Sequence, residues 1–220
     1  MTSSTARSRL HIELLSDATF SRGEGTAGLV DVEVEHDGLG LPFIGGRTVR
    51  GLLRDSWLSM QACFPDLADA GARVLGRSRS LDEGCRLRVG DALLPAPIQE
   101  SVRGGLERQE HPLGPETILA AFTEIRYQTA EDRNRGAPER TTLRSTRVVL
   151  RSFTFEAALT WLDGYQPDSA DLQVLALCAL ATRHGGLARN RGRGHLKCTI
   201  DGDLPRTRRL AGRPSTRRAS

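Results

Sequence analysis

Hydrophobic and polar residues alternate in several short stretches of the chain, and each stretch predicts a half-buried β-strand. Leu10, Ile12 and Leu14 alternate with polar residues over residues 9–15. In a second stretch, three valines alternate with three acidic residues from Val30 to Glu35, which predicts a strand with an acidic outer face. Further stretches predict strands over 85–89, 153–159 and 196–200.

Two longer stretches repeat their hydrophobic residues every three or four positions, which predicts α-helices. The first follows a turn at 42–46 and carries Val49, Leu53 and Trp57 on one face. The second is introduced by Asp168 with Asp171 three residues later, the spacing of a capping box, and it is ended by the glycines at 185–186. Weaker patterns predict helices over 66–75 and 115–122.

The order of the main elements is strand, helix, strand, strand, helix, strand. This order predicts an α+β, ferredoxin-like (RRM-like) βαββαβ fold, in which two helices cover one face of a four-stranded antiparallel sheet. Long insertions fall at 17–45 and 94–146, and residues 126–147 within the second predict an exposed hairpin. We expect residues 1–202 to form a single domain and residues 203–220, which have no hydrophobic pattern, to be a basic disordered tail.

The size and composition of the chain restrict its class. Its 220 residues suit one domain, and its longest stretch without a polar side chain, Val174–Ala181, is far too short to span a membrane. The polar N-terminus argues against a secretory signal. We therefore expect a cytoplasmic protein with no membrane partner, whose four cysteines are reduced thiols.

The positive charge is unevenly distributed and consists almost entirely of arginine. Residues 201–220 contain six arginines and two aspartates, which accounts for the whole net charge of +4, and Lys197 is the only lysine. The planar guanidinium suits phosphate and stacks on nucleobases. A GC-rich genome produces the same arginine bias, so composition alone does not establish nucleic-acid binding.

The glycine-rich loop at 185–194 carries the clearest chemical signal. Five cations and no acid lie between residues 183 and 197. Glycines let the backbone approach a ligand closely, and consecutive N–H groups can bind an anion. The loop runs from helix to strand, which excludes a dinucleotide-binding loop. We expect it to bind RNA phosphates, with a solvated helix end as the alternative; the residues predicted to bind are Gly186, Arg189, Asn190, Arg191 and Arg193.

Two further basic segments could extend this site. Helix N-termini attract phosphates, and the helix that starts near residue 46 carries Arg47, Thr48, Arg50 and Arg54, although a solvated helix face remains an alternative. The excursion at 126–151 has seven basic and three acidic residues, with Tyr127 as its one aromatic side chain. Because the two helices of a ferredoxin-like fold are neighbours, we expect the two glycine-bearing segments to form one groove.

Taken together, these segments resemble the RAMP superfamily, the repeat-associated proteins of CRISPR effector complexes. Residues 41–54 are similar to the family's proline-aromatic turn and basic helix, and residues 185–194 to its C-terminal glycine-rich loop. Thr129, together with 143–147 and 153–155, resembles the thumb and following strand of type III backbone subunits, nearest to type III-D. The resemblance extends over residues 10–199.

The resemblance implies a subunit that binds guide RNA (crRNA) and has a thumb that enters the guide–target duplex. Thr129 and Arg144 would contact RNA from the thumb. The partners implied are crRNA, target RNA, paralogous RAMP proteins, and the large and small subunits of the complex. In cleaving subunits of this family a loop aspartate cuts target RNA with a divalent metal. Asp31 lies at the matching distance before Pro42 and would be both the catalytic residue and the ligand of Mg²⁺ or Mn²⁺, orienting a ribose 2′-OH for in-line attack.

Other functions remain open from the sequence. Asp31 could be an ordinary solvated acid beside Glu33 and Glu35, which would make the chain a non-catalytic structural RNA-binding subunit. A metal-independent guide-processing endoribonuclease would use His36 or His195 as its base. An unrelated ferredoxin-like protein with an arginine-rich surface is the fourth possibility.

Overall fold

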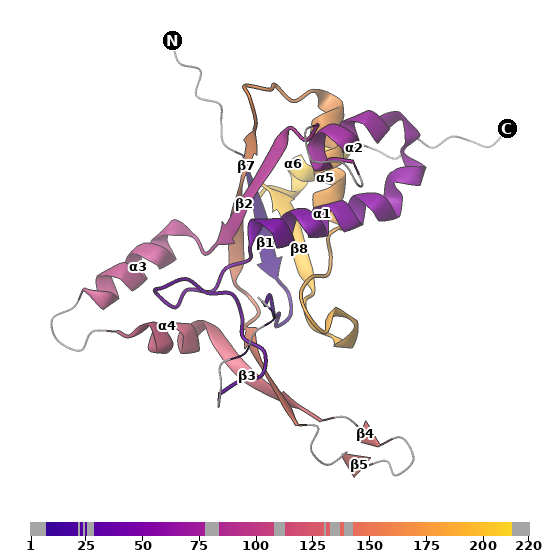
Figure 1. The fold of residues 1–220 in the computed structure, drawn as a ribbon. Coiled ribbons are helices and arrows are strands. Elements are labelled where there is room, and N and C mark those ends of the chain that lie inside the picture. The colour runs from indigo at the N-terminus through magenta and orange to yellow at the C-terminus, as the bar shows by residue number, and fades with distance from the viewer. Residues whose placement is uncertain are drawn as a thin grey trace.

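A computed structural model of the chain describes residues 8–21, 23, 25, 29–77, 84–107, 113–129, 131–132, 137–138 and 143–212. Its centre is a four-stranded sheet with the strand order β2-β7-β1-β8, in which all neighbouring strands are antiparallel (Figure 1). The strands are β1 (Arg9–Leu14), β2 (Leu87–Leu93), β7 (Thr154–Trp161) and β8 (Leu196–Ile200). This arrangement confirms the predicted α+β fold.

Two helices cover the sheet as the hydrophobic pattern predicts. Helix α1 (Gly46–Met60) buries Val49, Leu53 and Trp57, and it contacts β2 and α5 (Ser169–Ala181). Helix α5 is apolar on all sides because it also packs against α2 (Ala68–Leu75), α6 (Leu204–Ala211) and β8. Short 3-10 turns at Gln61–Cys63 and Pro65–Leu67 join α1 to α2.

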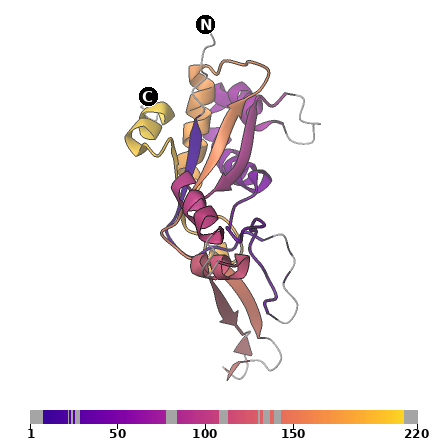
Figure 2. The same ribbon diagram turned by 90° about the vertical axis from the view of Figure 1, so that its left-hand side faces the viewer.

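The long insertion between β2 and β7 forms a protruding part of the molecule. It contains α3 (Ala96–Leu106), α4 (Pro115–Phe122) and a hairpin of β3 (Thr123–Gln128) and β6 (Arg144–Val149), which we call the thumb. Short strands β4 (Glu131–Asp132) and β5 (Ala137–Pro138) pair beyond it. Figures 1 and 2 show the thumb pointing away from the sheet.

One prediction from the pattern is wrong, and one helix was not predicted. Residues 30–34 form no regular strand: Val30 and Val34 are buried, but the segment pairs with β6 only through an isolated bridge from Val32 to Thr146. Helix α3 was not predicted from the sequence. Only two of its residues, Val102 and Gly105, are buried, which is too few to give a helical repeat of hydrophobic positions.

The start of the predicted disordered tail is also ordered. Asp203 accepts a hydrogen bond from the Arg206 N–H (2.8 Å) and so caps α6, while Thr207 is fully buried and bonds to the Ile200 N–H (2.9 Å). These contacts are polar and local, so the hydrophobic pattern does not reveal them. Residues 213–220 lie outside the described residues.

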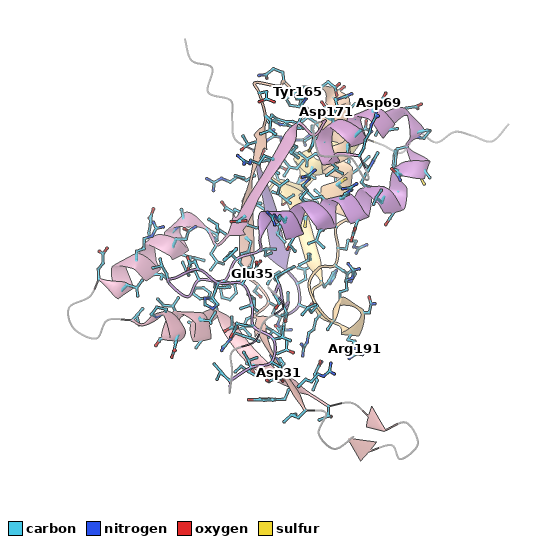
Figure 3. All side chains as sticks on the ribbon, viewed as in Figure 1. Asp31, Glu35, Asp69, Tyr165, Asp171 and Arg191 are labelled. Atoms are coloured by element: carbon cyan, nitrogen blue, oxygen red, sulfur yellow. The ribbon has the colours of Figure 1, made fainter. Side chains whose placement is uncertain are left out.

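A buried carboxylate stabilises the end of the domain that lies away from the thumb (Figure 3). The predicted capping box is present, and Asp171, whose exposed fraction is 0%, accepts hydrogen bonds from Tyr165 Oη (2.6 Å) and Arg73 Nε (3.0 Å). Arg73 also reaches Asp168 (2.9 Å). A buried charge is tolerated only when it is paired and hydrogen-bonded, so α2, α5 and the loop at 165 depend on this one group.

We expect Tyr165→Phe to lower the free energy of unfolding by about 1–2 kcal/mol, because it removes one bond to a buried carboxylate. Asp171→Ala should cost more, about 3 kcal/mol, since Arg73 keeps only the exposed Asp168 as a partner, Tyr165 loses its acceptor, and the reciprocal half of the capping box is lost. Urea unfolding followed by circular dichroism measures both. Tyr127→Phe, at the only other tyrosine and 65% exposed, is the control and should be neutral.

Candidate nucleic-acid interface

The base of the thumb is fixed to the domain by two segments that precede α1. Ala18 and Val149 exchange two backbone hydrogen bonds (3.0 and 2.8 Å). The Asp31 and Val32 N–H groups both donate to the Ser145 carbonyl (3.1 and 3.2 Å), and the Arg147 N–H donates to the Val32 carbonyl (2.9 Å). The residues around Asp31 therefore move with strand β6.

A nearly buried ion pair reinforces this junction. Arg147 Nε donates to Glu33 Oε1 at 2.7 Å, and the two side chains are 10% and 13% exposed. The guanidinium also bonds Thr123 on the opposite strand (3.3 Å), while the Arg147 carbonyl accepts from the Thr19 hydroxyl (2.9 Å). The sequence analysis placed Glu33 on an acidic outer face, but the structure uses it to neutralise a buried arginine.

Asp31 is exposed, and its carboxylate is held at the thumb base (Figure 3). Its Oδ2 accepts hydrogen bonds from the Ser145 N–H (2.7 Å) and the Ser145 hydroxyl (3.0 Å). These two bonds, with a smaller contribution from the charge of Arg144, lower the pKa of Asp31 below its ordinary value. The group is therefore an oriented carboxylate at neutral pH.

The thumb residues near Asp31 include an aromatic side chain that the sequence analysis did not assign to the site. Tyr127 is directly opposite Ser145 in the β3–β6 ladder, and directly opposed side chains share one face of a hairpin. Its side chain therefore lies on the same face of the hairpin as the Ser145 side chain, whose hydroxyl bonds Asp31. Arg144 is exposed one residue before Ser145, and Thr129 is exposed just after β3.

The donor set around Asp31 fits one particular mode of metal binding. Among the residues that the structure describes, no group of three or more His, Cys, Asp or Glu side chains could hold a metal. Glu33 is paired with Arg147, and Glu35 accepts from the Gly45 N–H (3.1 Å). Mg²⁺ commonly takes one or two carboxylates and completes its shell with water and substrate phosphate. Asp31 fits that mode as a single protein ligand.

The cysteines take no part in such a site. All four are free thiols, and only Cys63 is exposed. Burial raises the pKa of Cys178 and Cys198 to about 12. They remain protonated and pack as small apolar side chains.

The glycine-rich loop has a fixed shape that displays its cations. The Gly185 N–H donates to the Gly194 carbonyl (2.9 Å), and the Gly194 N–H donates to the Asp17 carbonyl (2.8 Å). Between them, Arg189–Arg191 form a 3-10 turn flanked by left-handed Ala188 and Gly192. The side chains of Arg189, Asn190 and Arg191 are exposed.

The loop also approaches the base of the thumb. Arg193 and Gly192 line a hollow of about 610 Å³ together with Arg126 and Arg151, at the foot of the hairpin. Asp17 lies in the same hollow and pairs with Arg126 (3.0 Å). The loop and the thumb, two of the three basic segments, therefore share a surface. Nothing in the sequence indicated that Asp17 and Arg126 would meet there.

Two arginines of the third basic segment, on helix α1, do not face the glycine-rich loop. Leu52 faces the loop, since a Cβ at Gly185 would lie 2.9 Å from Leu52 Cδ1. Arg50 instead donates to the Leu75 carbonyl at the end of α2 (3.2 Å). Arg54 lines a hollow with Asp69 between α1 and α2, at the end of the molecule opposite Asp31 (Figure 3). The structure thus brings neither arginine to the loop.

The N-terminus of α1 already has carboxylate partners. Asp91 Oδ1 accepts from the Gly46 N–H (2.7 Å), and Glu35 accepts from the Gly45 N–H. These acids occupy the position where the sequence analysis expected a phosphate. Arg47 and Thr48 remain exposed in the first turn of the helix.

The two histidines considered as catalytic bases, His36 and His195, both make contacts within the domain. The His195 ring stacks on that of His184 (centroids 5.2 Å apart), and the backbone N–H of His195 donates to the Ser16 hydroxyl (2.9 Å). His36 Nδ1 lies 3.0 Å from the Asp37 carbonyl oxygen. Both histidines have structural contacts that account for their positions.

Comparison with known proteins identifies the family. Residues 11–197 match the model of the RAMP superfamily, so the chain belongs to that superfamily. No curated protein sequence matches it. Two solved structures share the fold with a TM-score of 0.65 and 13% sequence identity: the type III-B Cmr-beta complex bound to cognate target RNA, and the same complex in its apo state.

The matched chains are similar in length to this one. The first alignment covers 93% of this chain and 98% of the Cmr-beta chain, and the second covers 90% and 98%. Both neighbours are type III-B, so the similarity to type III-D stays a prediction. Within the described ranges, no helix has the length and apolar composition needed to cross a membrane.

We expect Ser145→Ala to raise the pKa of Asp31 toward its ordinary value, because the hydroxyl bond is lost while the backbone bond remains. NMR titration of the Asp31 carboxyl carbon measures the shift. In the wild type, the Asp31–Ser145 contact stabilises the thumb base fully when the pH is above the ordinary carboxyl pKa. This stabilisation is lost as the pH falls through the lowered pKa of Asp31. An unchanged pKa in Ser145→Ala would contradict the assignment of that hydrogen bond.

The loop glycines provide a matched pair of substitutions. Gly194 has φ +67°, and a Cβ there would lie 1.9 Å from the Gly185 carbonyl oxygen; Gly192 has φ +80° but open space around it. Gly192→Ala should cost about 1–2 kcal/mol for its left-handed backbone. Gly194→Ala should cost clearly more, because backbone must also move. Equal costs in urea unfolding would show that the loop is not closed as described.

Proposed function

We propose that this chain is an RNA-binding backbone subunit of a type III CRISPR effector complex. Membership of the RAMP superfamily and similarity to a chain of a Cmr complex bound to cognate target RNA support this function. Its partners would be crRNA, target RNA, paralogous RAMP subunits, and the large and small subunits of the complex.

The exposed side of the glycine-rich loop is the proposed contact for the guide strand. Arg189, Asn190 and Arg191 project from a turn whose shape is fixed by backbone bonds, so the backbone of the loop loses little freedom when the side chains bind phosphate. Gly186 lets the loop lie directly on the Thr19 carbonyl. Arg47 and Thr48 from the first turn of α1 are the remaining helix contacts.

The thumb base is the proposed position of target RNA. The observation that carries this proposal is the Asp31 carboxylate, which is exposed, ionised and oriented by Ser145 where the thumb leaves the domain. Tyr127 offers a ring for stacking an unpaired base beside it, and Arg144 offers a charge for phosphate. A nucleotide held between these groups would place its backbone at the carboxylate.

Target cleavage is the catalytic part of the proposal. When bound, Mg²⁺ or Mn²⁺ supplies positive charge to the scissile phosphate. Asp31 would hold the cation at the thumb base, and the fixed β6–Asp31 junction would keep the carboxylate in place while the strand is splayed. The chain's contribution is position and charge, as expected for in-line attack by a neighbouring ribose hydroxyl.

A specific observation favours the non-catalytic alternative. Oδ2 of Asp31 already accepts two hydrogen bonds, and Glu33 and Glu35 are committed to other partners. In that case Asp31 would act as a bracket between β6 and the segment before α1, and the chain would bind RNA without cutting it.

The test uses the assembled complex with its guide, target RNA and Mg²⁺ or Mn²⁺. Asp31→Asn keeps the shape of the side chain but removes its charge, so we expect cleavage at this subunit to fall by at least about a hundredfold. Assembly and RNA binding should be unchanged. Asp163→Asn is the matched control, because Asp163 is an exposed aspartate whose left-handed backbone asparagine tolerates.

Two results would decide between the alternatives. If the Asp31→Asn complex still cleaves target RNA at this subunit, or if the wild-type complex does not cleave it, only the RNA-binding function remains. Failure of wild type and variant alike to retain RNA would remove the function itself.

A further inference from the structure

Some arginines at the surface of the described domain have an acidic partner, and others have none. Arg86 pairs with Asp163 (3.4 Å), Arg126 with Asp17 (3.0 Å) and Arg206 with Asp201 (2.6 Å). Within the described part of the chain, neither Arg183 nor Arg208 forms an ion pair, although both are exposed. Both guanidinium groups are therefore available to an external anion, and what distinguishes them is the hollow that they share.

These two arginines meet at a hollow between β8 and α6. The hollow has a volume of about 240 Å³, and its floor is apolar, formed in part by Leu15, Leu180 and Leu204. Its polar rim carries Arg183, His195, Lys197 and Arg208, and no acidic residue lines it. Lys197 has Glu13 as a partner outside the hollow (2.8 Å).

The local structure does not account for this concentration of charge. Arg183 directly follows α5, and a cation is favourable at the C-terminal end of a helix. That effect explains one charge and not three. Arg208 is brought to the hollow by α6, whose place is fixed by Thr207 and by a bond from Gln173 to the Ala211 carbonyl (3.1 Å).

The hollow is also connected to the glycine-rich loop. Arg183 lines a second hollow, of about 570 Å³, together with His184 and Arg189 of the loop. That hollow contains one acid, Asp55. Basic side chains thus continue from Arg189 through Arg183 to Arg208, and Figure 2 shows that α6 lies on the side of the molecule opposite α1 and α2.

We propose that Arg183, Lys197 and Arg208, with His195, form a second phosphate-binding site that extends the path of single-stranded RNA from the glycine-rich loop to α6. This inference rests on the proposed RNA-binding function. The unpaired guanidinium groups bind phosphates of the strand, and the apolar floor lies below the sugar or base.

The test compares three double variants of the full chain that each remove two positive charges. Arg183→Gln/Arg208→Gln removes the proposed site, and Arg189→Gln/Arg191→Gln removes the loop contacts. Arg86→Gln/Arg206→Gln is the control, because both arginines are already paired with an aspartate, and Arg206 shares α6 with Arg208. The probe is a labelled oligouridine, whose binding is measured over a range of salt concentrations.

Each lost phosphate contact should reduce the slope of log affinity against log salt by about 0.7. We therefore expect the Arg183/Arg208 variant to bind more weakly at low salt, with a slope shallower by about 1.4. The control should keep the wild-type slope, and circular dichroism should show that all variants are folded.

The outcomes separate this site from the proposed function. If only the loop variant loses affinity, the second site is wrong while the RNA-binding function stands. If wild type shows no salt-dependent binding, the function itself falls. If the Arg183/Arg208 variant keeps its slope but fails to enter the complex, the surface binds a protein subunit and the proposal is overturned.

Discussion

The Arg147–Glu33 ion pair is the interaction on which the candidate site depends. A buried guanidinium without a counter-charge would be strongly destabilising, so Glu33 must lie beside β6 whenever the thumb is folded. The position of Glu33 fixes its neighbour Asp31, two residues earlier on the same segment. The pair therefore links the hairpin, the segment before α1 and the exposed carboxylate into one rigid unit. The location of Asp31 is a consequence of packing, whatever chemistry it performs.

The main fold was predictable because its signals are local and repeat at short intervals. Leu10, Ile12 and Leu14 mark β1, and Asp168 and Asp171 mark the start of α5 by a capping motif that the structure contains. The elements that were missed are held by other means. Helix α6 depends on Asp203 and Thr207, and the segment at 30–34 depends on single bridges to β6. Polar contacts leave no periodic pattern, whether they join near residues, as at α6, or distant ones, as at 30–34.

The same distinction applies to the candidate site. The sequence shows which segments carry cations, but it could not say which side of α1 those side chains face. Arg50 and Arg54 are turned toward α2, and the helix N-terminus is occupied by Asp91 and Glu35. Pairing with distant acids also could not be predicted: Arg147 pairs with Glu33, and Arg126 pairs with Asp17 as well as with the nearby Glu124. Among the described residues, the arginines that can bind an external phosphate are those without an acidic partner. The folded structure, and not the sequence, shows which arginines these are.

The exposure of a single cysteine has a practical consequence. Cys85, Cys178 and Cys198 are buried, whereas Cys63 lies exposed in the turn that follows α1. A maleimide fluorophore would therefore attach at one defined position of the natural sequence. Movements of a labelled RNA relative to the helical end of the domain could then be followed by energy transfer without any engineered residue.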